Sequence, residues 1–405
     1  MTPNRTTGAP AAAGTSPAWG AAQWVLLCVL SGNMLLDAVE VSVVLVGLPT
    51  VGDAMGMSML TAQCLMSGFA LGFAAMLPLG GRVAARWGRS RPYLAAMAVF
   101  ALASAAGGLA DSESLLIATR VVKGCCAALT APFGLAIIGT AFREGPDRRR
   151  AVSVYSMFGA TGFTAGLLLS AALLTSSWRW TFFFPAPVAL VLLLVAARVI
   201  PAGPGAASPA PGPSPLRDGR LRRSAIGAAS LNGVYAGLLM LVTFQIQQRL
   251  GWSPWRCALA LLPACVPLMA TVPFSGRLVA RWGTERLIAL GALASFLGCA
   301  VYAWRAPEQS YGTAILPALL LVEAAFVLSF AALNTQATAT IRPADRGPAV
   351  SLYQTGVQLG AVVTLPLVAL SAGGAGHRSA PLCLAAVGAA GLTAALTGLR
   401  RTAHR

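Results

Sequence analysis

The chain has 405 residues, of which 57% are hydrophobic and only 10% are charged. Ordinary soluble domains carry roughly 25% charged residues, so this composition excludes a soluble globular protein and indicates a membrane protein. The formal net charge of +17 is spread over short arginine clusters between apolar runs, a pattern that indicates membrane topology rather than a nucleic-acid-binding domain.

Twelve apolar runs are long enough to cross a bilayer, because a transmembrane helix needs about 20 apolar residues. In chain order they occupy 24–48, 60–80, 92–110, 114–140, 151–174, 180–199, 225–247, 256–275, 287–304, 313–336, 348–371 and 380–399. We therefore predict an all-α membrane protein of twelve transmembrane helices.

A break in the middle of the chain predicts two halves. Residues 201–223 are rich in Pro, Gly and Ala and then basic, so they read as a cytoplasmic linker. The expected division is a tail at 1–22, six-helix halves at 23–200 and 224–400 on either side of the linker, and a short tail at 401–405.

The positions of the basic residues predict the orientation. Of 28 arginines and one lysine, 22 fall on the side that holds both termini, five fall on the opposite side, and Arg120 and Lys123 lie within a span. Cytoplasmic loops carry the excess of Lys and Arg in membrane proteins. We expect a multi-pass protein of the cell inner (cytoplasmic) membrane with cytoplasmic N- and C-termini.

One arginine-rich phrase occurs twice. GRVAARWGRSR at 81–91 and GRLVARWGTER at 276–286 share seven of eleven residues, and each follows the second span of its half. A motif repeated at the same place predicts halves related by a pseudo-twofold axis along the membrane normal. We expect Gly81 and Gly276 to allow close helix approach, and a second glycine in each copy, Gly88 and Gly283, to allow a tight turn.

The phrase resembles the cytoplasmic-loop signature of the major facilitator superfamily, G-x-x-x-D-[RK]-x-G-[RK]-[RK]. The matching residues are Gly81, Arg86, Gly88 and Arg89 in the first copy and Gly276, Arg281 and Gly283 in the second. The aspartate of the signature is replaced by Ala85 and Ala280. The resemblance implies the major facilitator fold, with a central cavity between the halves.

Further stretches resemble the drug:proton antiporter branch of that family. SWRWTFFFPAPVAL at 177–190 is similar to the start of its sixth span, and FQIQQRLGWSPWRCALALLP at 244–263 is similar to its seventh and eighth spans. The export motif of the fifth span survives only around Gly166, without its proline. The resemblance implies a proton-coupled exporter.

Five ionisable residues fall well inside predicted spans: Asp37, Glu40, Arg120, Lys123 and Glu323. An isolated charge at the bilayer centre costs roughly 2.5–3.5 kcal/mol, so these groups must face one another or water. The first two acids continue a polar stripe from Asn33 at helical spacing, and the two bases share one face of the fourth span.

Two interpretations of the charges remain open. In the first, Asp37, Glu40, Arg120 and Lys123 couple transport to protons, with one acid carrying the proton and Arg120 responding to it. In the second, Glu40 with Lys123, or Asp37 with Arg120, form ion pairs that only orient helices. For the transport mechanism, we expect the acids and bases of the first, fourth and tenth spans to face one shared aqueous chamber.

Polar residues of other spans are candidates for substrate contact: Glu323, Asn33, Asn232, Tyr235, Gln245 and Gln358. Glu323 would bind a cationic group or act as a second proton site. Hydrogen bonding between helices explains the neutral members of the set equally well.

Together these features predict a proton-coupled secondary transporter that exports small lipophilic compounds by alternating access. There is no G-x-x-x-x-G-K-[ST] loop, so we expect no ATP hydrolysis and no enzyme. The eight cysteines form no C-x-x-C pair and only His377 and His404 are present, so we expect neither metal nor cofactor. The expected partners are a small-molecule substrate, protons and the lipid bilayer, without nucleic acid, for a functional monomer. The alternatives are a proton symporter for a small metabolite and a non-transporting membrane sensor.

Overall fold

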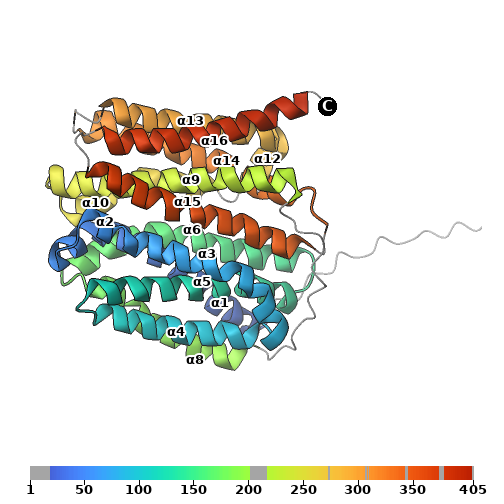
Figure 1. Ribbon diagram of the computed structural model, residues 1–405. Coiled ribbons are helices and arrows are strands. Elements are labelled where there is room, and N and C mark those ends of the chain that lie inside the picture. Colours follow the sequence, from blue (N-terminus) through green and yellow to red (C-terminus); the bar gives the residue numbers. More distant parts are fainter. Residues whose placement is uncertain are drawn as a thin grey trace, which may run out of the picture.

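A computed structural model describes residues 19–200, 217–271, 274–305, 308, 310–342, 345–373 and 378–403. Within these ranges the chain is helical and contains no strand, which confirms the predicted all-α fold. The long helices lie side by side in one bundle (Figure 1). Residues 1–18 of the expected tail at 1–22, most of the linker and both histidines lie outside the described residues.

The N-terminal half forms the lower part of the bundle in Figure 1. Its helices are α1 (Ala21–Met55), α2 (Met59–Ala62), α3 (Cys64–Trp87), α4 (Ser90–Gly108), α5 (Glu113–Ala141), α6 (Pro146–Leu174), α7 (Trp180–Phe183) and α8 (Pro185–Val199).

The C-terminal half forms the upper part. Its elements are α9 (Gly219–Phe244), η2 (Gln245–Arg249), α10 (Pro254–Leu261), η3 (Leu262–Ala264), α11 (Val266–Thr271), α12 (Ser275–Trp282), α13 (Thr284–Arg305), η6 (Tyr311–Ile315), α14 (Leu316–Thr338), α15 (Arg346–Ala372) and α16 (Ser379–Ala403). Because α9 begins at Gly219, residues 219–223, which we expected in the linker, are helical.

Eleven helical segments of the described chain are long and apolar enough to cross a membrane. The third expected span, α4, is not among them, because its first turn contains Arg91 and Pro92 and lowers its hydropathy. It nevertheless packs along α5 and α8, where a third span of this half would lie. The observed helices therefore account for all twelve expected runs.

Small residues bring the helices of each half close together. A Cβ atom on Gly166 of α6 would lie 2.1 Å from Ser42 Oγ of α1, and one on Gly360 of α15 would lie 1.9 Å from the carbonyl oxygen of Ala229 of α9. The two helix pairs occupy equivalent places in the two halves. The residual export motif around Gly166 thus packs α6 against α1.

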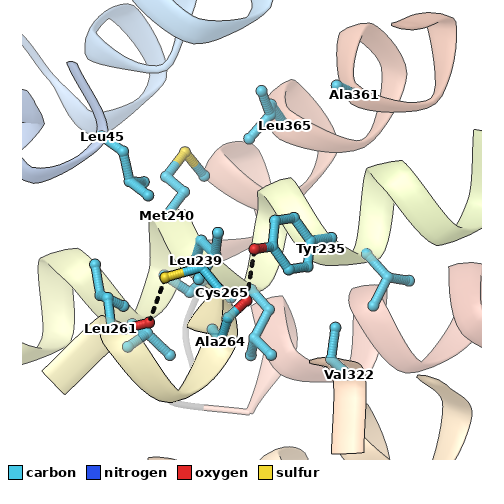
Figure 2. Packing of buried hydrophobic residues seen from close by; sticks show 14 of the residues in the cluster. Leu45, Tyr235, Leu239, Met240, Leu261, Ala264, Cys265, Val322, Ala361 and Leu365 are labelled. Atoms are coloured by element: carbon cyan, nitrogen blue, oxygen red, sulfur yellow. Dashed lines mark hydrogen bonds between the residues drawn. The ribbon is translucent and has the colours of Figure 1, made fainter. Parts of the chain in front are cut away.

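The two halves contact each other through two pairs of helices, α3 with α15 and α6 with α10. A twofold relation between the halves places α3 where the α10–α12 segment lies, and α6 where α15 lies. The contact of α3 with α15 is therefore equivalent to the contact of α6 with α10. The larger hydrophobic cluster joins the C-terminal half to the second part of α1. Figure 2 shows Leu45 of α1 reaching toward Met240 of α9 in this cluster.

The two arginine phrases lie at the α3–α4 and α12–α13 turns, at what we call the arginine-rich end of the bundle; the opposite end is the arginine-poor end. Gly88 and Gly283 both have φ of 76°, which confirms the predicted turns. The expected close approach at Gly81 and Gly276 is wrong, because a Cβ atom there meets no atom within 4 Å among the described residues. Both glycines lie on helix faces that point away from neighbouring helices.

Candidate functional site

A buried charge cluster joins three helices of the N-terminal half. Glu40 of α1 forms ion pairs with Arg120 and Lys123 of α5, and Lys123 Nζ lies 2.6 Å from Glu40 Oε1. Arg120 also donates from Nε to the carbonyl of Leu65 on α3, at 2.8 Å. The side chains of the acid and both bases are at most 1% exposed. The cluster therefore ties α1, α3 and α5 together away from solvent.

Aromatic rings cover the two cations. The guanidinium carbon of Arg120 lies 4.8 Å from the ring centre of Phe69, and Lys123 Nζ lies 5.2 Å from that of Phe100. A ring face attracts a cation and excludes water. These rings offset part of the cost of holding two cations beside one carboxylate.

The second acid of α1, Asp37, has neutral partners. Its Oδ2 accepts a hydrogen bond from Thr130 of α5 at 2.9 Å and another from Asn33 at 3.2 Å. None of the ion pairs among the described residues involves Asp37, so the expected pair with Arg120 is not formed. Together, Asp37, Glu40, Arg120 and Lys123 carry a formal charge of zero when Asp37 is ionised and of +1 when Asp37 is protonated.

Glu323 lies in the other half, on α14, and its side chain is 1% exposed. It interacts electrostatically with Tyr235 of α9 and with Cys265. The charges of α1 and α5 lie in their own closed interface, so the expectation of one shared aqueous chamber for all five charges is wrong for this conformation. The helices around each group pack too closely to leave its side chain open to solvent.

A row of aromatic rings connects the halves beside Glu323. The ring of Tyr235 lies 6.1 Å from that of Phe163 on α6 and 4.8 Å from that of Phe326 on α14. Phe326 stacks on Phe330 at 5.2 Å. The hydroxyl of Tyr235 donates to the carbonyl of Ala264 at 2.7 Å, as Figure 2 shows.

The neutral substrate candidates mostly bond to neighbouring helices. Asn232 of α9 donates to the carbonyl of Val357 on α15 at 2.9 Å, and Gln245 accepts from Tyr302 of α13 at 2.5 Å. Gln358 is half-buried on α15. For Asn232 and Gln245, the alternative of interhelical hydrogen bonding describes the geometry.

Sequence reasoning missed Thr130 and the phenylalanines. Thr130 lies seven residues after Lys123, so helical periodicity puts it on the face that carries the cations. Phe326 and Phe330 follow Glu323 at the same kind of spacing, three and seven residues on. Phe163 has no such signal, because it comes from the other half.

At the arginine-poor end, glutamines of η2 bond across the halves. Gln247 donates from Nε2 to the carbonyl of Val46 on α1 at 2.8 Å, and Gln248 donates to Asp53 at 3.3 Å. The halves are thus joined at this end.

The arginines of the loop motif lie at the opposite end. Arg86 lies over the ring of Trp87, at 5.6 Å from the ring centre, Arg89 precedes the first turn of α4, and Arg281 lies in the last turn of α12.

Comparison with known proteins places the chain among transporters. The family model described as Major Facilitator Superfamily matches residues 30–365. The chain is 32% identical over 259 residues to the cephamycin export protein CmcT of Amycolatopsis lactamdurans, which covers 63% of this chain and 50% of that protein. It is 28% identical over 410 residues to the puromycin resistance protein pur8 of Streptomyces alboniger, covering 85% and 81%. The chain spans about a third to a half of the length of the first curated relatives it matches.

The fold also matches solved structures. The crystal structure of a D-xylose-proton symporter superimposes with a TM-score of 0.75 at 16% sequence identity, covering 93% of this chain and 97% of that one. Similarity at this level of identity is evidence for the shared fold alone.

Proposed function

The chain belongs to the major facilitator superfamily, and from this we propose that it exports small lipophilic compounds in exchange for protons by alternating access. Membership of a transporter family agrees with the expectation that the chain is not an enzyme. Relatives named for cephamycin export and puromycin resistance support export as the direction. The nature of the cargo, a small and largely apolar compound, is part of the proposal.

The observation that carries proton coupling is the contrast between the two acids of α1. Glu40 forms ion pairs with two cations, one at each oxygen of its carboxylate. Asp37 is almost as deeply buried, but its hydrogen-bond partners Thr130 and Asn33 are both neutral. We therefore assign proton uptake and release to Asp37, and charge balance to Glu40.

Protonation of Asp37 would then act on helix packing. An ionised Asp37 accepts a hydrogen bond from the hydroxyl group of Thr130, and this bond ties α1 to α5. A protonated Asp37 leaves the neighbouring cluster of Glu40, Arg120 and Lys123 with an uncompensated positive charge in a low-dielectric interface. The two protonation states therefore favour different arrangements of α1 and α5, which is the difference that proton coupling requires. Moving one charge across 100 mV supplies about 2.3 kcal/mol for this step.

The compound would bind at the row of aromatic rings between the halves. Phe163 comes from α6, Tyr235 from α9 and Phe326 from α14, so a compound held among them contacts both halves. Aromatic side chains bury large apolar surfaces, and Glu323 one turn away would attract a basic group on the compound. A site shared by both halves is what a rocking mechanism uses.

The topology completes the proposal. The arginine-rich end would face the cytoplasm, with both termini on that side of the inner membrane, as the 22-to-5 distribution of basic residues favours. Residues 23–200 and 224–400 would move as the two halves, and one chain would suffice for transport.

A growth assay tests the export of lipophilic compounds. A strain that lacks its own major exporters would be grown with and without the protein, on a panel that includes puromycin, a cephamycin and lipophilic cations. We expect higher inhibitory concentrations for at least one compound with the wild type, and no increase with Asp37→Asn. Glu144→Gln is the matched control, because its side chain is 85% exposed, and it should behave as the wild type.

Reconstituted vesicles test the coupling. With a compound found in the growth assay, proton movement out of acid-loaded vesicles should accelerate on addition of compound to the wild type and not to Asp37→Asn. Coupled proton movement that persists in Asp37→Asn and is lost in Glu323→Gln would contradict the assignment and transfer it to Glu323. Resistance to no compound, together with uptake of a sugar or another metabolite, would contradict export itself.

A further inference from the structure

A groove of about 420 Å³ lies on the outside of the N-terminal half, away from the aromatic rings between the halves. Its walls are α3 and α4, with Met76 and Trp87 on one side and Arg91 and Val99 on the other. Its floor is α5, which contributes Cys125 among others. Helices α3 and α4 each pack along α5 but make few contacts with each other, so the space between them stays open.

The shape of the groove follows from glycine packing. At Gly72 and Gly124 the backbones of α3 and α5 touch, since a Cβ atom on either glycine would lie 2.0 Å from a carbonyl oxygen of the other helix. The groove begins one helical turn beyond this contact, at Met76, and continues to the arginine-rich end at Trp87. Eleven residues of helix span about 16 Å, close to one leaflet of the roughly 30 Å hydrocarbon core.

The walls of the groove and its mouth differ in chemistry. Its walls are almost entirely apolar, whereas its mouth carries the exposed Arg91 and the 54% exposed ring of Trp87. Segment 81–91 contains four arginines and no acidic residue. Among the described residues, none of the ion pairs uses an arginine of this segment. The mouth thus combines uncompensated positive charge with an aromatic ring of the kind found at membrane interfaces.

We propose that this groove binds an anionic phospholipid of the leaflet at the arginine-rich end. One acyl chain lies between α3 and α4 over the floor of α5, and the headgroup phosphate contacts Arg91. The apolar walls match a hydrocarbon chain, the length matches one leaflet, and the charge at the mouth selects an anionic headgroup over a zwitterionic one.

The second copy of the arginine phrase supplies a matched control. Arg286 stands 195 residues after Arg91, at the same place in the phrase, and it is also exposed. In that copy Glu285 precedes the arginine, where the first copy has Ser90. If the charge acts through the groove, removal of Arg91 must therefore weaken the binding of the anionic lipid, and removal of Arg286 must not.

Native mass spectrometry of the detergent-purified full-length protein tests the proposal, with dioleoyl phosphatidylglycerol and dioleoyl phosphatidylcholine as probes. We expect the Kd for the first bound phosphatidylglycerol to be at least fivefold below the Kd for the first bound phosphatidylcholine. Arg91→Gln should raise the phosphatidylglycerol Kd about fivefold, as expected for one basic residue at a membrane surface, and Arg286→Gln should leave it unchanged. Equal affinities for the two lipids, or equal effects of the two arginine variants, would overturn the proposal.

A second variant tests the apolar part of the site. Ala95→Trp adds a large ring at an exposed lining position, so it should abolish tight binding of both lipids while Arg91 remains. Its folding is checked by a symmetric gel-filtration peak. If it does not fold, quenching of Trp87 fluorescence by brominated phosphatidylglycerol, against Trp87→Phe as baseline, replaces it. Displacement of the lipid by an exported compound at the same site would overturn the proposal in favour of a substrate entrance.

Discussion

Lys123 Nζ lies 2.6 Å from Glu40 Oε1, and the other oxygen of the same carboxylate pairs with Arg120. One buried acid therefore serves two buried cations. The three groups are not equivalent for stability, because removal of the acid leaves two cations without a partner, whereas removal of one cation leaves a neutral pair.

Glu40→Gln should therefore destabilise the protein strongly and Lys123→Met only mildly. Breaking a buried pair by removing one partner costs about 3–5 kcal/mol, and Glu40→Gln breaks two pairs at once. Lys123→Met retains the pair of Glu40 with Arg120 and replaces an ammonium group by an apolar chain of similar length. Thermal unfolding in detergent, followed by the loss of the monodisperse gel-filtration peak, measures both. A lower midpoint for Lys123→Met than for Glu40→Gln would contradict this charge accounting.

The sequence predicted the members of this cluster but not all of their partners. Charges inside apolar runs are conspicuous, and helical spacing puts Arg120 and Lys123 on one face, so a contact with α1 could be expected. Whether Arg120 and Lys123 contact Asp37 or Glu40 depends on the rotation and depth of α1 relative to α5. The packing of the two helices determines both. Thr130 was missed because a neutral hydroxyl in a span gives no charge signal, although it decides the environment of Asp37.

The same limit explains the two glycines of the arginine phrase. A glycine at the junction of two helical runs indicates a turn whose backbone needs a positive φ. The turn at Gly88 could therefore be predicted from the sequence. Whether Gly81 touches another helix depends on which face of α3 packs, and periodicity did not determine that. The space beside Gly81 is open, and the close approach occurs at Gly72 instead.

Alanine substitutions at the two positions should therefore differ. Gly88→Ala forces a side chain into φ of 76° and ψ of −172°, a backbone region essentially restricted to glycine, and should cost about 1–3 kcal/mol. Gly81→Ala adds a methyl group in open space on a helix, where alanine is favoured, and should leave the unfolding midpoint unchanged or slightly raised. Thermal unfolding of both variants in one detergent makes the comparison, and equal losses would show that the phrase does not act through its turn.

Asp218 should make stability depend on acid pH at the arginine-rich end. It precedes α9 and accepts hydrogen bonds from Thr340 at 2.6 Å and from the backbone N–H groups of Arg220 and Leu221. Partial burial opposes ionisation, but these hydrogen bonds outweigh it and hold the pKa of Asp218 below its ordinary 3.8. A depressed folded-state pKa gives stability that is present above the unfolded value and lost as pH falls through the folded one.

The test compares wild type with Asp218→Ala across pH. At pH 7 the variant should lose about 0.5–2 kcal/mol, the usual cost of removing an N-cap. The difference between the two proteins should shrink as the pH falls below about 4. Unfolding midpoints between pH 3 and pH 7 measure it, and a difference that does not depend on pH would contradict the role of the ionised carboxylate.

Gln247 should control which end of the bundle is closed. Its side chain donates to the carbonyl of Val46 across the halves at 2.8 Å, whereas the neighbouring bond from Gln248 to Asp53 is exposed and longer, at 3.3 Å. Replacing Gln247 by Leu removes a hydrogen bond worth about 1 kcal/mol from the closed arginine-poor end, which shifts the ratio of the two states about fivefold toward opening there. Spin labels at Ala54 and Arg256, in a background without reactive cysteines, would report the larger separation in pulsed electron resonance. Gln248→Leu is the matched control and should shift the distances less, because an exposed bond competes with water. A population of the longer distance that is unchanged by Gln247→Leu would mean that apolar packing around Leu45, rather than this bond, keeps the end closed.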